Sequence, residues 1–202
     1  KCVELAKDDG FVYLVTPTTW CSPTSDLSRK DALDKETRLW NIFDKYTSKA
    51  NVTDIKAYFP GVGSSFGIVS VDKSGSDGLS FSNGEKTSLG FFSFSGTDEV
   101  EDNLSSTNNI QSRYRISAHT DGRYRVSIFK SRKVCPENVE VLAYEESPSS
   151  GANQSLFVNI TVPTLEEAIM VRSRVLECSE ILNKHCRYNG FIDQKILGMI
   201  SL

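Results

Sequence analysis

The sequence lacks the features that mark several large classes of protein. No apolar run approaches the ~18 residues of a membrane-spanning helix, so we expect no membrane span. No Cys-X-X-Cys pair occurs and there are only two histidines, so we expect no bound metal and no other cofactor. The formal net charge is −3, and the chain therefore has no general basic excess that would favour a nucleic-acid partner.

The remaining composition is that of a folded domain. With 39% hydrophobic and 24% charged residues, 13 Gly and only 6 Pro, the chain is neither disordered nor collagen-like. At 202 residues it is long enough to bury a core without help from a metal. We predict a single domain over residues 1–202.

Two features predict a secreted, glycosylated protein. The sequence begins at Lys1 rather than at Met and shows no basic-then-apolar leader, as expected after removal of a signal peptide. It also contains four Asn-X-Ser/Thr acceptor triplets, at Asn51, Asn103, Asn153 and Asn159. Asn51 and Asn103 lie in polar stretches suited to exposed loops, whereas Asn159 lies in an apolar run.

The cysteines agree with an oxidising compartment. Five are present and widely spaced, namely Cys2, Cys21, Cys135, Cys178 and Cys186. We expect two disulfides and one odd thiol. The odd thiol is free, links two chains into a dimer, or carries a ligand. Cys178 and Cys186 fall on one predicted helix, about 12 Å apart along its axis, which is farther than a disulfide reaches.

Hydrophobic periodicity predicts a mainly β or α+β fold. A strand is expected at 11–15 and a helix at 29–46. From 54 to 129 short alternating segments between Gly, Asn and Ser clusters predict an antiparallel β-meander, which is either open or closed into a barrel. Further elements are predicted C-terminal to it: strands at 139–144 and 156–162, a long C-terminal helix that is capped by Thr164 and ends before Asn189-Gly190, and a strand at 191–200.

The clearest local signal is a predicted β-hairpin. Segments 112–117 and 122–127 both alternate polar and apolar residues, and Asp121-Gly122 between them is a turn former. One face of this hairpin would carry four arginines, Arg113, Arg115, Arg123 and Arg125. This face is either simply solvated or binds an acidic protein, a glycan sulfate or a carboxylate.

The apolar side of the predicted sheet supports a second hypothesis. A curved antiparallel sheet that closes on itself either fills its interior or holds one small ligand. We therefore predict a cavity for a small hydrophobic molecule, with five aromatic wall residues, Phe66, Phe92, Phe94, Tyr114 and Tyr124. The competing interpretation is a plain packed core.

Enzymatic chemistry receives the least support. Gly63-Ser64-Ser65-Phe66-Gly67 matches the nucleophile elbow of hydrolases, but a predicted strand follows it where the elbow requires a helix. The available bases are His119, in a predicted turn, and His185, beside Cys186 near a helix end. We therefore expect a protein that binds rather than an enzyme, with a serine hydrolase through Ser65 as the third choice.

Several of these segments together resemble a lipocalin. Trp40 is followed by Lys56-Ala57-Tyr58-Phe59-Pro60-Gly61, then by Thr120-Asp121-Gly122-Arg123-Tyr124, which is similar to the family's turn motif, and then by Arg172 and Arg174. The resemblance implies a secreted carrier that holds a small apolar molecule inside an eight-stranded barrel. It also implies bridges between Cys2 and Cys135 and between Cys21 and either Cys178 or Cys186. The alternative to carriage is a secreted module, such as an immune modulator or attachment factor, that recognises an extracellular protein or glycan.

Overall fold

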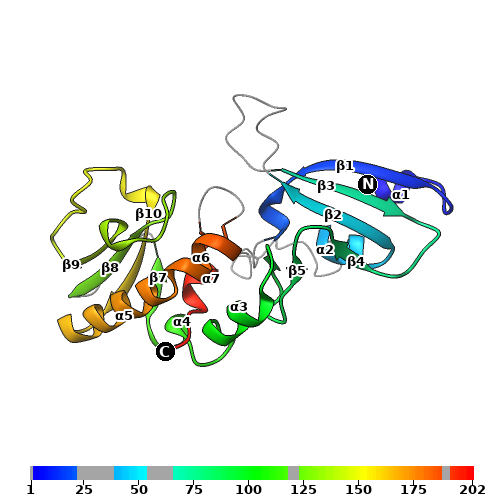
Figure 1. Cartoon of the computed structure of the whole chain (residues 1–202). Helices are drawn as coiled ribbons and strands as arrows, with labels where there is room; N and C mark the ends of the chain where they lie inside the picture. Colours follow the sequence, from blue (N-terminus) through cyan, green and yellow to red (C-terminus); the bar gives the residue numbers. More distant parts are fainter. Residues whose placement is uncertain (1, 22–38, 54–65, 118–122, 188–191) are drawn as a thin grey trace. The chain divides into compact units, whose positions relative to one another are not determined.

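The chain folds into two compact units, Lys1–Ser95 and Gly96–Leu202. The structure is a computed structural model, and it describes residues 2–21, 39–53, 66–117, 123–187 and 192–202 (Figure 1). We call the two parts the N-terminal unit and the C-terminal unit and describe each by itself. The single domain over 1–202 stays a prediction. Within the described residues, no helix has the length and apolar character to span a membrane.

The N-terminal unit is built on a four-stranded sheet. The strand order is β1-β3-β2-β4, with β1 (Phe11–Pro17), β3 (Phe66–Asp72), β2 (Thr47–Thr53) and β4 (Leu79–Phe81). The β1–β3 and β2–β3 pairs are antiparallel, and β4 runs parallel to β2. A short antiparallel ribbon and three small helices complete the unit: β5 (Glu85–Lys86), β6 (Phe92–Ser93), α1 (Cys2–Leu5), η1 (Thr18–Cys21) and α2 (Leu39–Asp44).

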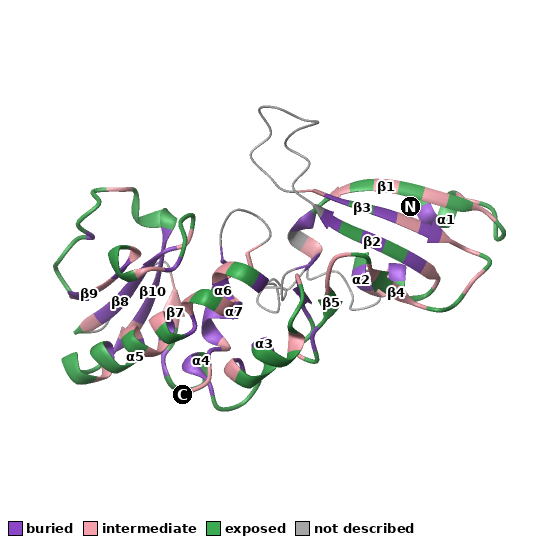
Figure 2. Ribbon diagram, in the orientation of Figure 1, coloured by how far each residue is buried: buried purple, intermediate pink, exposed green. Residues whose placement is uncertain are grey.

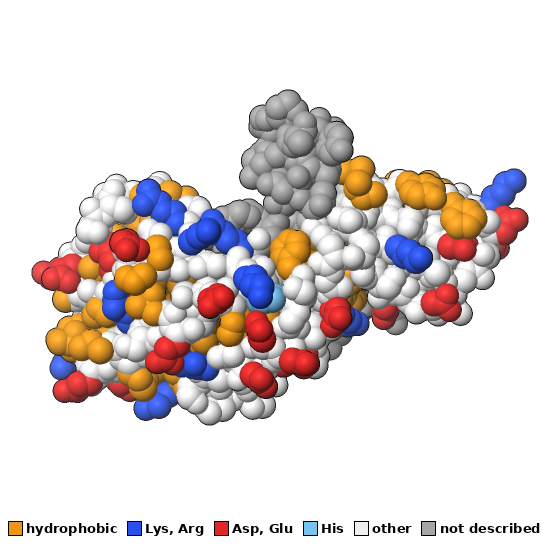
Figure 3. All heavy atoms as spheres, viewed as in Figure 1, with side chains coloured by type: hydrophobic (Ala, Val, Ile, Leu, Met, Phe, Trp, Pro, Cys, Tyr) orange, Lys and Arg blue, Asp and Glu red, His pale blue; other side chains and the backbone are white. Residues whose placement is uncertain are grey.

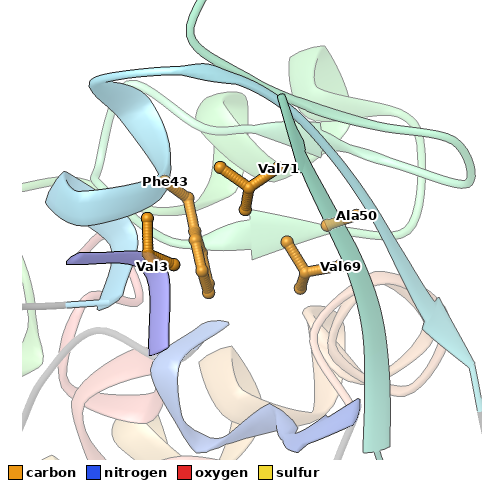
Figure 4. Close-up of a cluster of buried hydrophobic side chains, with 5 residues drawn as sticks. All are labelled: Val3, Phe43, Ala50, Val69 and Val71. Carbon is orange, nitrogen blue, oxygen red and sulfur yellow. The ribbon is translucent and has the colours of Figure 1, made fainter. Parts of the chain in front are cut away.

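One face of this sheet forms the core of the N-terminal unit. Alternate residues of β3 are buried, so that Val69 and Val71 point to the same side. They meet Ala50 of β2, Phe43 of α2 and Val3 of α1 (Figure 4). Side chains along β3 alternate between the two faces of the sheet. One face is therefore buried, and it packs against two helices.

The opposite face of the same sheet is exposed along β1. Phe11, Tyr13 and Val15 alternate with partly buried Val12 and Leu14 and keep more than half of their surface in contact with solvent. Figure 3 shows exposed hydrophobic side chains on the unit that carries β1. The alternating pattern that predicts a strand at 11–15 is thus confirmed.

The C-terminal unit contains a second four-stranded antiparallel sheet. Its order is β7-β10-β8-β9, with β7 (Arg115–Ser117), β10 (Phe157–Val162), β8 (Tyr124–Phe129) and β9 (Val139–Ala143). Strands β8 and β10 are buried almost throughout, as Figure 2 shows. The remaining elements are α3 (Thr97–Asn103), α4 (Ile110–Arg113), η4 (Pro136–Asn138), η5 (Gln154–Leu156), α5 (Leu165–Glu177), α6 (Ser179–His185) and α7 (Gln194–Gly198).

Helix α5 covers the second sheet and begins where the sequence predicts. It packs against β8, β9 and β10 and buries Ala168, Val171 and Val175. The Thr164 hydroxyl accepts a hydrogen bond from the backbone N–H of Glu167 at 3.2 Å, the geometry of an N-cap. The expected long helix is divided at Cys178, whose N–H bonds to the carbonyls of both Arg174 and Leu176 before α6 continues.

The predicted hairpin of residues 112–127 is wrong in its pairing. Strand β10 lies between β7 and β8, so that Thr161 faces Arg115 on one side and Arg125 on the other. The first residues of the predicted strand instead form α4, which a capping box between Asn109 and Ser112 holds. Strand β10 is buried along almost its whole length and takes an interior position of the sheet, between β7 and β8.

Two further expectations differ from the structure. Helix α7 (Gln194–Gly198) replaces the predicted strand at 191–200, because the Asp193 side chain accepts from the Lys195 N–H and caps a helix there. Helices α3 and α4 also interrupt the region predicted as meander. The mixed α and β class with antiparallel sheets is confirmed. In the described part of the chain neither sheet closes into a barrel, and neither has the sequential strand order of a meander.

Candidate functional site

Both tryptophans of the chain meet in the N-terminal unit. Trp20 lies on η1, directly after β1, and Trp40 lies on α2, before β2. Their ring centroids are 5.9 Å apart and their planes are inclined at 64°. Two large aromatic surfaces therefore form a corner rather than a stack.

This corner opens onto a small pocket, which we call the tryptophan pocket. Its volume is about 150 Å³, and the described residues that line it are Trp20, Trp40, Asn41, Lys86 and Gly90. An apolar cavity of about 150 Å³ holds one benzene molecule, whereas sites for drug-sized ligands measure about 300–1,000 Å³. The pocket therefore fits a molecule with about one ring.

A second layer of aromatic residues supports the corner from behind. Phe43 contacts Trp20 edge-on at 5.3 Å, and Phe81 lies 6.1 Å from Trp20 and 5.5 Å from Trp40. Phe92 then contacts Phe81 at 4.7 Å. Because Phe43 and Phe92 are fully buried, the orientation of the two indoles is fixed by packing.

The two indole N–H groups differ in their partners. Trp20 Nε1 donates to Thr16 Oγ1 at 2.8 Å. Trp40 is only 7% exposed, and within the described residues no group accepts a hydrogen bond from its buried Nε1. Buried donors are nearly always paired with protein, water or a ligand. The Trp40 N–H is therefore a buried donor without a partner among these residues, and because less than 1 Å² of Nε1 is accessible, it does not open onto the tryptophan pocket.

Lys86 supplies a positive charge to the same pocket. Its Nζ lies 5.2 Å from the centroid of the Trp40 ring, which is the geometry of a cation–π contact. The nearest described carboxylate is Asp44, with an Nζ–Oδ2 distance of 4.0 Å, and both side chains are 47% exposed. Such exposed ion pairs contribute about 0–1 kcal/mol, so Asp44 neutralises the ammonium only weakly.

The turn between β5 and β6 positions Lys86 and Gly90. The N–H and hydroxyl of Thr87 both bond to the Phe91 carbonyl, at 2.9 Å each, and Thr87 is buried. Gly90 has φ +81°, a left-handed conformation, and its N–H donates to the Thr87 carbonyl. This hydrogen-bonded turn thereby places Lys86 and Gly90 at the tryptophan pocket.

The five predicted wall residues are divided between the two units. Phe66, Phe92 and Phe94 belong to the N-terminal unit, and Tyr114 and Tyr124 to the C-terminal unit. None of them lines the tryptophan pocket, although Phe92 contacts both Phe81 and Phe94 in the layer behind it. Tyr114 is buried, and its hydroxyl donates to Glu167 Oε1 at 3.2 Å. Burial, followed by this bond, raises the pKa of Tyr114.

The four predicted arginines do not share one exposed face. Arg113, Arg115 and Arg123 are exposed. Arg125 is buried, and its guanidinium donates to the carbonyl oxygens of Tyr144 and Glu146. Burial lowers the pKa of Arg125, and the Glu146 carboxylate partly offsets this effect. Through these two hydrogen bonds Arg125 of β8 anchors the backbone that follows β9.

The four acceptor asparagines differ in accessibility. Asn51 of β2 and Asn153 before η5 are exposed. The Asn103 amide donates to the Glu99 carbonyl and accepts from Arg174. Asn159 is 5% exposed in the middle of β10, between β7 and β8. The structure thus leaves the side chains of Asn51 and Asn153 open to an added sugar.

The cysteines fall in both units. Cys2 and Cys21 belong to the N-terminal unit, and Cys135, Cys178 and Cys186 to the C-terminal unit. Cys2 is exposed, whereas Cys21, Cys178 and Cys186 are buried. Burial raises the pKa of all three buried thiols, and that of Cys186 reaches about 12. The disulfides and their pairing stay predictions.

The catalytic candidates are placed only in part. Ser65, His119 and Lys56-Ala57-Tyr58-Phe59-Pro60-Gly61 lie outside the described residues. His185 is 1% exposed, and its Nε2 lies 3.3 Å from Glu99 Oε2, although this contact lacks hydrogen-bond geometry. Arg172 and Arg174 each donate from Nε to a backbone carbonyl, that of Val139 and that of Ser201.

Sequence reasoning missed most of the tryptophan pocket. Trp40 falls within the predicted helix at 29–46 and among the segments that resemble a lipocalin, and no pattern in the sequence singles out Trp20 as a site residue. The signal that could have located the pocket is the small number of tryptophans, since the chain has just two and both line it. Comparison of the chain with family models, with curated proteins and with solved structures finds no match.

Proposed function

We propose that this protein binds a small molecule with about one ring in the tryptophan pocket. The observation that carries the proposal is a pocket of about 150 Å³ lined by two indoles whose orientation is fixed by packing. This function belongs to the carrier class expected from the sequence. The site, however, is an aromatic corner beside an open sheet and not the interior of a barrel.

The size of the pocket sets the affinity that an experiment should expect. At about 0.5 kcal/mol for each of about nine heavy atoms, binding contributes roughly 4.5 kcal/mol, a Kd of about 0.5 mM. Titrations should therefore extend to about 10 mM ligand.

The two tryptophans are built-in reporters for the test. A ¹⁵N-labelled sample has one indole N–H resonance for each, and Trp40→Phe assigns them. We expect ring compounds such as toluene and benzoate to shift both resonances with a single Kd. Phe11→Leu is the control, since Phe11 is exposed on β1 and does not line the pocket. No shift at 10 mM with either compound would contradict the proposal.

A second candidate function uses the exposed arginines of the C-terminal unit. Arg113, Arg115 and Arg123 remain on the surface, and Arg113 lies 3.7 Å from the half-buried Glu167. We propose recognition of an acidic extracellular protein or glycan by this set as the alternative. Replacing these three with glutamine, while keeping Arg125, should abolish salt-sensitive binding to heparin-type sulfated glycans. Unchanged retention on such a column would reject this version.

A further inference from the structure

The open face of the N-terminal sheet carries an apolar stripe along β1. Phe11, Tyr13 and Val15 project from this face and remain more than half exposed. Ile68 of β3, which pairs with Val15, is also exposed and extends the stripe. No residue of β1 is charged, and β1 is the edge strand of this sheet among the described strands. Native proteins protect such edges, and a contiguous exposed apolar patch marks a surface that something covers.

Asn51 lies on the same open face, two strands away from β1. Its neighbours Ala50 and Val52 are buried toward the core, so the exposed Asn51 side chain points to the opposite side of the sheet. Asn51 pairs with Ile68, and Ile68 pairs in turn with Val15. The three residues therefore form one row across the sheet, in which successive strands are about 4.8 Å apart.

A glycan attached to Asn51 would begin beside the apolar stripe. The triplet Asn51-Val52-Thr53 is an acceptor for N-linked glycosylation in a secreted protein. A pyranose ring is comparable in length to the spacing between strands, so two sugars reach from Asn51 across Ile68 to Val15. A pyranose has an apolar face of C–H groups and hydroxyls around its edge. It can therefore cover apolar side chains while its hydroxyls stay in water.

We propose that an N-linked glycan on Asn51 covers the apolar stripe of β1 and β3. This inference goes beyond the proposed function and rests on the predicted secretion of the chain. The other three triplets, at Asn103, Asn153 and Asn159, all belong to the C-terminal unit. Asn51 is thus the one acceptor in register with the stripe, and its glycan removes apolar surface from water and hinders association through it.

Substitutions at Thr53 remove or keep this glycan without changing Asn51. Thr53→Val removes the hydroxyl that the triplet requires and keeps a β-branched residue, whereas Thr53→Ser keeps the triplet. Both variants of the whole chain are secreted from one glycosylating host, and peptide mass spectrometry measures the occupancy of Asn51. The two proteins then differ at this position of β2 chiefly by the glycan.

Hydroxyl-radical footprinting reports directly on the stripe. Tyr13 is the probe, and Tyr144, which is exposed in the C-terminal unit, is the internal reference. We expect modification of Tyr13, relative to Tyr144, to be several-fold higher in Thr53→Val than in Thr53→Ser. Enzymatic removal of the glycan from folded Thr53→Ser protein should produce the same rise, and this measurement decides if Thr53→Val does not fold.

Three results would overturn the inference. The first is an unoccupied Asn51 in folded, secreted Thr53→Ser protein. The second is equal modification of Tyr13 with and without the glycan. The third is protection of Tyr13 that light scattering traces to a dimer persisting without the glycan, since a second copy of the chain then covers the stripe. Each of them leaves the tryptophan pocket unaffected, because Asn51 and β1 do not belong to its lining.

Discussion

Gly96 and His185 are in direct contact, so that a Cβ on Gly96 would come within 2.9 Å of His185 Cε1. Gly96 caps α3 with φ +64°, and His185 ends α6 with 1% of its surface exposed. The close packing of α3 against α6 in the C-terminal unit thus depends on the missing side chain.

We predict that Gly96→Ala destabilises the protein by about 2–3 kcal/mol, from left-handed strain plus displacement of the buried imidazole. Gly151→Ala is the matched control, because Gly151 has φ +62° but open space around its Cα. It should cost only about 1 kcal/mol. Urea denaturation of both variants measures the difference, and equal costs would show that the contact with His185 contributes nothing.

Local patterns in the sequence were sufficient to predict individual elements. The alternation at 11–15 and the apolar runs at 139–144 and 156–162 correspond to β1, β9 and β10. The cap at Thr164 marks the first residue of α5 correctly. Hydrophobic periodicity and helix capping both depend on residues only a few positions apart, so they can be recognised in the sequence alone.

Strand pairing could not be predicted in the same way. Segments 112–117 and 122–127 look like partners because they are neighbours with a turn between them, yet β10 lies between the strands that they form. The position of β10 depends on burial of both its faces, and it pairs with residues of β8 that lie 28 to 38 positions away in sequence. The tryptophan pocket escaped prediction for the same reason, since its lining comes from three separate segments.

The arginines supply a second prediction, because they look equivalent in the sequence but differ in the structure. Arg125→Met should lower the free energy of unfolding by about 2–4 kcal/mol, since it leaves the carbonyls of Tyr144 and Glu146 without their donor. Arg123→Met should change it by less than about 0.5 kcal/mol, because Arg123 is exposed. Thermal or urea unfolding of the two variants decides, and a smaller effect for Arg125 than for Arg123 would refute the assignment.

Buried thiols make stability depend on alkaline pH. Burial raises the pKa of Cys186 from 9.0 to about 12, so the folded chain keeps the neutral thiol where the unfolded chain ionises. The stabilisation is complete below pH 9 and is lost between pH 9 and pH 12, because the unfolded state loses its proton first. For the reduced protein, we expect Cys186 to account for a loss of about 1 kcal/mol by pH 10.

Cys186→Ala isolates this contribution from the other groups that titrate in the same range. The variant is destabilised by its cavity at every pH, but its free energy of unfolding should fall less steeply from pH 8 to pH 10 than that of the unmodified chain. Urea denaturation at several pH values in reducing buffer gives both slopes. Identical slopes would mean that the Cys186 thiol ionises as readily in the folded state as in the unfolded state.

Glycosylation should follow accessibility rather than the presence of a triplet. We expect folded protein secreted from a glycosylating host to carry sugar at Asn51 and Asn153, which are exposed. Asn159 should carry none, because the residue is 5% exposed between two strands and an attached glycan would separate β10 from its neighbours. Peptide mass spectrometry after enzymatic deglycosylation in heavy-oxygen water marks each modified asparagine. Asn51→Gln should remove one glycan without changing the fold, whereas a marked Asn159 in folded protein would contradict the placement of β10.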